Sequence, residues 1–93
     1  MHNYETIMII SSKITDEEVQ KTISTIKELI EKNGELKTVE EWGKRKLAYP
    51  IQKQTEGYYV LIEFSSNSEF IDELERIYNI TDEVIKHIVV KKD

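Results

Sequence analysis

Two stretches of this chain, residues 7–10 and 58–64, are largely apolar on both faces of an extended backbone. Side chains alternate between the faces of a strand, so Ile7 and its neighbour Met8 point in opposite directions. A strand that is apolar on both faces suits the centre of a covered sheet better than an edge. A chain of 93 residues can bury one small core but not two. We therefore expect a single domain over residues 1–93 with these strands at its centre.

The spacing of apolar residues predicts two helices. Thr15 and Glu18 have the spacing of a capping box, in which each side chain caps the backbone N–H of the other residue. The apolar residues that follow recur every three or four positions and form one core-facing stripe: Val19, Ile23, Ile26, Leu29 and Ile30. Gly34 is expected to end this helix in a left-handed conformation. A second helix is expected from Ser68 to about Tyr78.

Two extended arms, residues 35–51 and 58–65, lie between the helices and are joined by a polar turn at residues 52–57. The arms are rich in aromatic and β-branched residues, which suit a pleated surface. Gly43 in the first arm indicates a bulge or a sharp bend. Pro50 has no backbone N–H, so the arm ends there or lies at a sheet edge. The two arms therefore predict a long β-ribbon.

Strands at residues 3–11 and Val84–Lys91 complete the order strand-helix-strand-strand-helix-strand. Two right-handed crossovers joined by a hairpin give an α+β, ferredoxin-like βαββαβ sandwich, a four-stranded antiparallel sheet with two helices on one face. The first and third strands are then central, in agreement with the doubly apolar pattern. The face without helices keeps apolar side chains. It is either a contact surface or is covered by long side chains from the ribbon.

Charge is unevenly distributed along the chain, whose net charge is −5. Acids outnumber cations by five to three in residues 15–33 and by six to one in residues 66–83, where the helices are expected. Residues 42–54 carry four cations and no acid, and residues 84–92 carry three cations and no acid. Cations on edge strands can simply prevent edge-to-edge aggregation. Cations interleaved with aromatics, as in residues 42–49, can also neutralise phosphates and stack on bases.

Motifs of catalysis and metal binding are missing from the sequence. There is no phosphate-binding or dinucleotide-binding glycine motif, no H-E-x-x-H and no Cys. His2 and His87 lie at opposite ends of the chain without ligand-like spacing, so no metal and no cofactor are expected. No apolar run approaches the roughly 18 residues that span a membrane, and the N-terminus lacks the features of a signal peptide. We therefore expect neither an enzyme with a small-molecule substrate nor a membrane protein.

Three segments of the ribbon carry a resemblance to a known family: Val39-Glu40-Glu41-Trp42-Gly43, Arg45-Lys46-Leu47-Ala48-Tyr49-Pro50-Ile51 and Gly57-Tyr58-Tyr59. With Tyr4-Glu5 near the start and residues 84–91 near the end, the chain resembles bacterial small ribosomal subunit protein six over essentially its whole length. The resemblance implies the ferredoxin-like fold and a structural role in the cytoplasmic ribosome. It also implies two partners, the eighteenth small-subunit protein and a junction in the central domain of the small-subunit ribosomal RNA.

The resemblance implies roles for particular residues. Eight residues are expected to contact RNA, because they match the family's basic, RNA-facing pattern or lie beside residues that do: His2, Tyr4, Lys44, Arg45, Lys46, Lys86, His87 and Lys91. Trp42, Leu47 and Tyr49 are expected to contact the partner protein. Because the chain as a whole is acidic, we expect it to bind RNA weakly alone and to depend on a basic partner for additional positive charge.

Two other kinds of protein share this topology. An RNA-recognition-motif module would need K/R-G-F/Y-G/A-F-V-x-F/Y on the third strand. Residues 56–63 depart from that pattern, with Glu56 in place of the cation and Tyr59 in place of the small residue. A ligand-sensing regulatory domain tends to have a glycine-containing loop after the first strand. Residues 11–14 contain no glycine.

Overall fold

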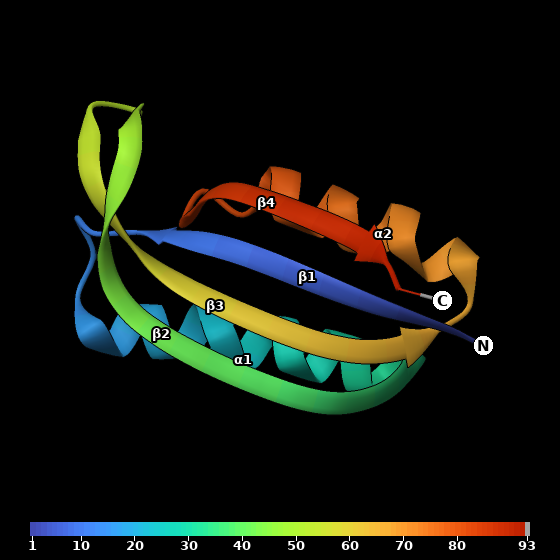
Figure 1. The fold of residues 1–93 in the computed structure, drawn as a ribbon. Helices are drawn as coiled ribbons and strands as arrows, with labels where there is room; N and C mark the ends of the chain where they lie inside the picture. The colour runs from blue at the N-terminus through green and yellow to red at the C-terminus, as the bar shows by residue number, and fades with distance from the viewer. Residues whose placement is uncertain (93) are drawn as a thin grey trace.

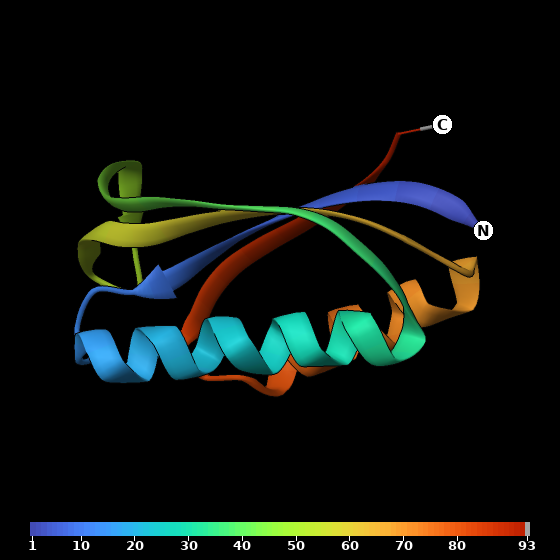
Figure 2. The same cartoon turned by 90° about the horizontal axis from the view of Figure 1, so that it is seen from below.

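The computed structural model describes residues 1–92, and Figure 1 shows its fold. Its elements, in chain order, are β1 (His2–Ser11), α1 (Asp16–Asn33), β2 (Gly34–Ile51), β3 (Gln54–Ser66), α2 (Ser68–Ile80) and β4 (Val84–Lys91). The sheet order is β2-β3-β1-β4 and the three pairings are antiparallel. Figure 2 shows both helices on the same side of the sheet. The predicted ferredoxin-like sandwich is confirmed, with the first and third strands at its centre.

The core lies between the sheet and the helices. Alternate residues of the central strands point into it, among them Met8 and Ile10 from β1 and Val60, Ile62 and Phe64 from β3. All five are less than 2% exposed. The residues between them in sequence point to the face of the sheet that no helix covers. The packing of the helices thus decides which half of each doubly apolar strand is core, a choice that the pattern leaves open.

The predicted start of the first helix is confirmed. Glu18 N–H donates to Thr15 Oγ1 at 3.2 Å and Thr15 N–H donates to Glu18 Oε1 at 3.3 Å, which completes the capping box. α2 begins at Ser68 as expected but continues two residues past Tyr78, to Ile80. β4 spans the predicted residues. No helix among the described residues is long and apolar enough to cross a membrane.

The predicted left-handed conformation of Gly34 is wrong. Gly34 has φ −174° and is the first residue of β2, so its backbone is extended. A Cβ on Gly34 would lie 2.1 Å from the backbone oxygen of Ser65 and 2.9 Å from Cβ of Ser66. Glycine is therefore needed here because β2 approaches β3 closely, not because the chain needs a positive φ.

The ribbon turn is shorter than expected. Only Gln52 and Lys53 lie outside the strands, and β3 already begins at Gln54, so the expected turn at residues 52–57 is wrong. Both turn residues have positive φ, 50° and 64°, as in the two-residue turns that match the twist of a hairpin. Gly43 has φ 80° at a break in the β2–β3 register, which confirms the bulge. Pro50 lies within β2, an edge strand, where a missing N–H is tolerated.

Candidate binding surface

The uncovered side of the sheet carries a group of apolar side chains that we call the open face: Ile7, Ile9, Tyr59, Leu61, Ile88 and Val90. Ile7 is paired with Leu61 on one side and Ile88 on the other, so the group runs across three strands. Ile88 and Val90 are 47% and 48% exposed. A shallow hollow of about 240 Å³ lies on this face among Ile7, Ile9, Tyr59 and Ile88. Ile9 and Leu61 are buried at 7% and 8%, so the exposed apolar area of this face lies mainly on β4. Neighbouring exposed apolar side chains such as these are typical of contact surfaces.

The ribbon covers one end of the open face. Leu47 is only 6% exposed because it packs with Ile9 and Ile85, and Ile51 and Tyr59 pack against the same cluster. Figure 1 shows this end of the ribbon turning past the end of β1 toward the side of the sheet where β4 begins. The alternative in which the ribbon covers the face is therefore met at one end, where Leu47 packs on Ile9. Ile88 and Val90 on β4 stay exposed, and their use as a contact surface stays a prediction.

Two contacts between cations and aromatic rings stand at the edge of the open face. The guanidinium of Arg45 lies 5.5 Å from the ring centre of Trp42, and the Trp42 ring is nearly parallel to that of Tyr59, with centroids 6.4 Å apart. Lys86 Nζ donates to Tyr49 Oη at 2.9 Å. This hydrogen bond and the charge of Lys86 lower the pKa of the Tyr49 phenol. The same hydrogen bond and the interaction with the Tyr49 charge raise the pKa of Lys86. Both cations are exposed and available to phosphate.

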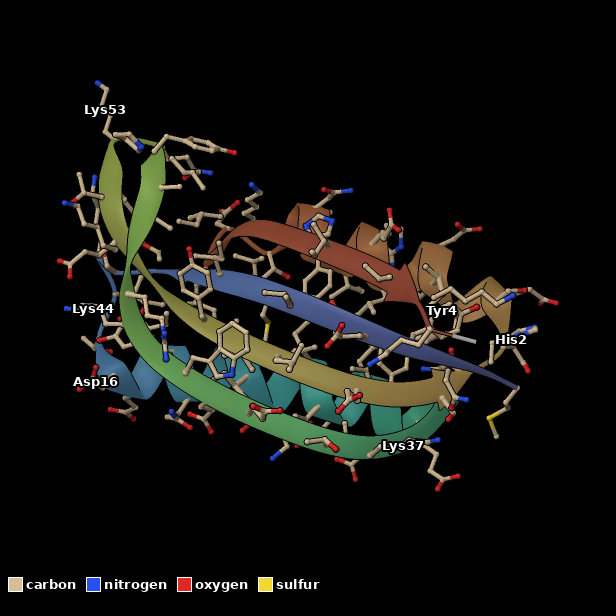
Figure 3. The ribbon with its side chains drawn as sticks, viewed as in Figure 1. His2, Tyr4, Asp16, Lys37, Lys44 and Lys53 are labelled. Carbon is tan, nitrogen blue, oxygen red and sulfur yellow. The ribbon has the colours of Figure 1, made fainter. Side chains whose placement is uncertain are left out.

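Lys44 belongs to a different surface from Arg45. Its Nζ lies 5.6 Å from the ring centre of Tyr58, whose hydroxyl donates to Asp16 Oδ1 at 2.9 Å. This hydrogen bond raises the pKa of Tyr58. A hollow of about 450 Å³ lies between the start of α1 and the ribbon, and its lining includes Asp16, Tyr58, Gln20 and Glu41. Gln20 Nε2 donates to Glu41 Oε1 at 2.9 Å. Lys44 therefore lies near an acidic helix start, as Figure 3 shows.

The remaining residues predicted to contact RNA lie in different surroundings. Lys46 is exposed and faces Glu56 across the ribbon, and Lys91 is exposed and pairs with Tyr4 in the β1–β4 register. Tyr4 is only 5% exposed and its ring stacks on Phe64 in the core, so the structure places this ring in the packing beneath the surface. His87 is half-buried, with its ring stacked on that of Tyr78 at 4.7 Å between centroids.

Five of the eight expected RNA residues thus lie in two groups at opposite ends of the sheet. Arg45, Lys46 and Lys86 lie at the ribbon end of the sheet, whereas His2 and Lys91 lie at the opposite end, near the two chain termini. The second end also carries two cations that sequence reasoning left unassigned. Lys37 Nζ donates to Asn3 Oδ1 at 2.8 Å and Lys92 Nζ lies 3.4 Å from Glu63 Oε2.

Sequence reasoning also did not name the exposed residues on the β4 edge of the open face. Ile88 and Val90 lie in an alternating strand, a signal that predicts their shared face but not whether a helix covers it. The partner residues that it named fall at the ribbon: Trp42 is 39% exposed and Tyr49 is 58% exposed, while Leu47 is internal. In residues 1–92, no group of three or more His, Cys, Asp or Glu is placed to hold a metal ion.

The fold and this surface define a binding module, in which an antiparallel sheet presents apolar side chains and nearby cations to another macromolecule. The profile of a family described as ribosomal protein S6 matches residues 3–91. Small ribosomal subunit protein bS6 of Caldanaerobacter subterraneus subsp. tengcongensis is 48% identical over 94 residues, which cover 100% of this chain and 99% of that protein. The protein of the same name from Clostridium novyi is 47% identical with the same coverage.

A solved structure supports the same assignment. 30S ribosomal protein S6 from Thermotoga maritima matches with a TM-score of 0.94 and 33% identity, over 98% of this chain and 87% of that one. A hydroxynitrile lyase from Passiflora edulis has a TM-score of 0.51 at 14% identity, which shows a likeness of fold alone.

The chain belongs to the ribosomal protein S6 family of bacteria. It is a structural component of the small ribosomal subunit and not an enzyme, and its place is the cytoplasmic ribosome. This assignment agrees with the sequence resemblance and replaces the RNA-recognition-motif and ligand-sensor alternatives.

Proposed function

We propose that this protein binds the junction in the central domain of the small-subunit ribosomal RNA as a heterodimer with the eighteenth small-subunit protein. The observation that supports the proposal is the open face, with Ile88 and Val90 exposed on its β4 edge and the cation–aromatic contacts beside it. An apolar surface beside cations suits a protein partner and a phosphate backbone at the same time. The role requires positioning and shape recognition and no catalysis.

The partner protein occupies the exposed part of the open face and contacts the aromatic side chains of the ribbon. Trp42 and Tyr49 supply exposed aromatic area, and Ile88 supplies an exposed apolar contact on β4. Leu47 acts from beneath, because its packing on Ile9 holds the ribbon in place. Aromatic residues at the centre of an interface carry a large share of binding energy.

The RNA contacts come from the cations at the sheet ends, with Arg45, Lys46 and Lys86 at the ribbon end. These side chains are exposed and can neutralise phosphates without rearrangement of the fold. The net charge of −5 opposes a polyanion, so the isolated protein binds RNA weakly. A basic partner adds phosphate contacts, and the affinity of the heterodimer therefore falls more steeply with salt than the affinity of the isolated protein.

The RNA contacts are tested by salt titration of the heterodimer on a central-domain RNA fragment. Replacing Arg45 and Lys46 with Ala should lower the slope of log affinity against log salt by about 2, one for each lost phosphate contact. The matched control replaces two exposed lysines of α1, Lys21 and Lys32, with Ala and should leave the slope unchanged. Equal slopes for the two variants would refute the RNA role of the ribbon cations, and equal slopes for isolated protein and heterodimer would refute the partner's contribution.

The partner contact is tested by one substitution on each side of the molecule. Ile88→Asp places a charge on the open face, where Ile88 is 47% exposed, and should weaken the heterodimer at least tenfold. Ile80→Asp makes the same change at an exposed position of α2, where Ile80 is 63% exposed, and should leave binding unchanged. Isothermal titration with the purified partner measures both. Equal affinity of the two variants would place the partner elsewhere.

A further inference from the structure

The end of the ribbon, residues 47–53, is weakly held by the sheet itself. The register between β2 and β3 breaks between Lys46 and Ile51, so the strand pairing is interrupted at the base of the ribbon end. Gln52 and Lys53 close the turn with positive φ, a backbone conformation that residues other than glycine rarely adopt. The direction in which the ribbon end points must therefore be set by side-chain contacts.

Gln54, the first residue after the turn, makes side-chain hydrogen bonds that join the ribbon end to the end of β1 and the loop after it. Its side chain is only 6% exposed. Its Oε1 accepts three hydrogen bonds from the end of β1 and the loop that follows it: from Ser12 N–H at 2.9 Å, from Ser11 Oγ at 3.0 Å and from Ser12 Oγ at 3.2 Å. Ser11 Oγ is itself oriented, because it accepts from Lys13 N–H at 3.1 Å. One buried oxygen thus joins segments that are more than forty residues apart in sequence.

These hydrogen bonds bear directly on the edge of the open face. Gln54 pairs with Ile51 across the turn, and Ile51 packs with Leu47 against Ile9 and Ile85. The same placement brings Tyr49 Oη to 2.9 Å from Lys86 Nζ on β4. Figure 1 shows the ribbon end rising beside the β1–α1 loop and the start of β4.

We propose that Gln54 is a positioning residue for the partner surface. By accepting from Ser11 and Ser12 it fixes the ribbon end, and with it the Tyr49–Lys86 contact, in the binding geometry before the partner arrives. A surface that is already ordered loses less conformational freedom on association, so its affinity is higher. This inference rests on the proposed heterodimer, but its structural half concerns the unbound protein and is tested without a partner.

The test compares Gln54→Met with Gln52→Met. Methionine keeps the length and apolar volume of glutamine and removes the accepting oxygen, while Gln52 is exposed at the turn and accepts nothing from the β1–α1 loop in the described contacts. Hydrogen exchange of the unbound protein should be about tenfold faster over residues 47–53 in Gln54→Met, the effect of losing one or two net hydrogen bonds. The exchange rates of Met8 and Ile62 in the central strands should not change. Gln52→Met should exchange at the same rates as the wild-type protein throughout.

The second measurement is affinity for the partner. Gln54→Met should bind about tenfold more weakly than Gln52→Met. Unchanged exchange over residues 47–53 in Gln54→Met would overturn the proposal, and so would faster exchange with unchanged affinity. If the unchanged protein binds no partner, the proposed heterodimer fails, while the exchange result still decides whether Gln54 orders the ribbon. Ser12→Ala removes one donor without altering the ribbon and should give a smaller effect in the same segment, which covers the case of a Gln54 variant that folds poorly.

Discussion

Tyr78 offers a test of the core, because the effect of Tyr78→Phe on the free energy of unfolding should change sign with pH. The side chain is 1% exposed, and its hydroxyl lies 2.9 Å from Thr6 Oγ1. Thr6 Oγ1 already donates to the backbone oxygen of Ile88 at 2.9 Å, so the Tyr78 hydroxyl is the donor to Thr6. In Tyr78→Phe, Thr6 keeps its bond to Ile88 and only one hydrogen bond is lost. The expected loss of unfolding free energy near pH 8 is therefore about 1 kcal/mol.

Alkaline pH should reverse the ranking of the two proteins. Burial raises the pKa of the Tyr78 phenol from 10.0 to about 12. Between these values the unfolded chain has released the phenolic proton and the folded protein has kept it, so the free energy of unfolding falls as pH rises. Because the two pKa values differ by about 2, the free energy of unfolding falls by up to about 2.7 kcal/mol above pH 12. Phenylalanine at this position does not titrate, so Tyr78→Phe is spared this loss. The loss exceeds the lost hydrogen bond from about pH 10.7 upward, where Tyr78→Phe should become the more stable protein.

The assay is urea unfolding followed by far-ultraviolet circular dichroism at pH 8, 10 and 11.5, with both proteins under identical conditions. The other tyrosines and the lysines titrate in both proteins, so their effects largely cancel in the difference. A difference in unfolding free energy that is the same at pH 8 and pH 11.5 would refute the argument, because it would mean that the Tyr78 phenol ionises in the folded protein as easily as in the unfolded chain.

Two further predictions concern the backbone. Gly34→Ala should lower the free energy of unfolding by about 2 kcal/mol or more, because its Cβ would overlap a main-chain oxygen. Gly43→Ala, at φ 80° with no atom within 4 Å of the new Cβ, should lower it by only about 1 kcal/mol. Equal losses in thermal unfolding would contradict the close approach of β3 to Gly34. Replacing Gln52-Lys53 with Asn-Gly should raise the unfolding free energy by about 1 kcal/mol, because these residues favour the positive φ of both turn positions. A lower melting temperature for that variant would show that the turn residues are not strained.

The candidate site was predictable in its basic and aromatic residues but not in how they are grouped. Arg45 and Trp42 belong to one run of sequence, and the structure keeps them in contact. Tyr4 and Leu47 were expected at binding surfaces, yet they are 5% and 6% exposed. Their burial depends on which face of the sheet the helices cover and on where the ribbon end docks. Neither is a property of the neighbouring residues in the chain.

The sequence by itself determined the elements, their order and the family. The capping box at Thr15 and the bounds of β4 follow from interactions between residues close in the chain, which a pattern records directly. The tertiary structure alone decided the role of Gly34, the docking of Leu47 and the burial of Gln54. Each of these depends on contacts between residues 31 to 43 positions apart, such as Gly34 with Ser65 and Gln54 with Ser11, and such contacts exist only once the strands are paired and the ribbon is bent.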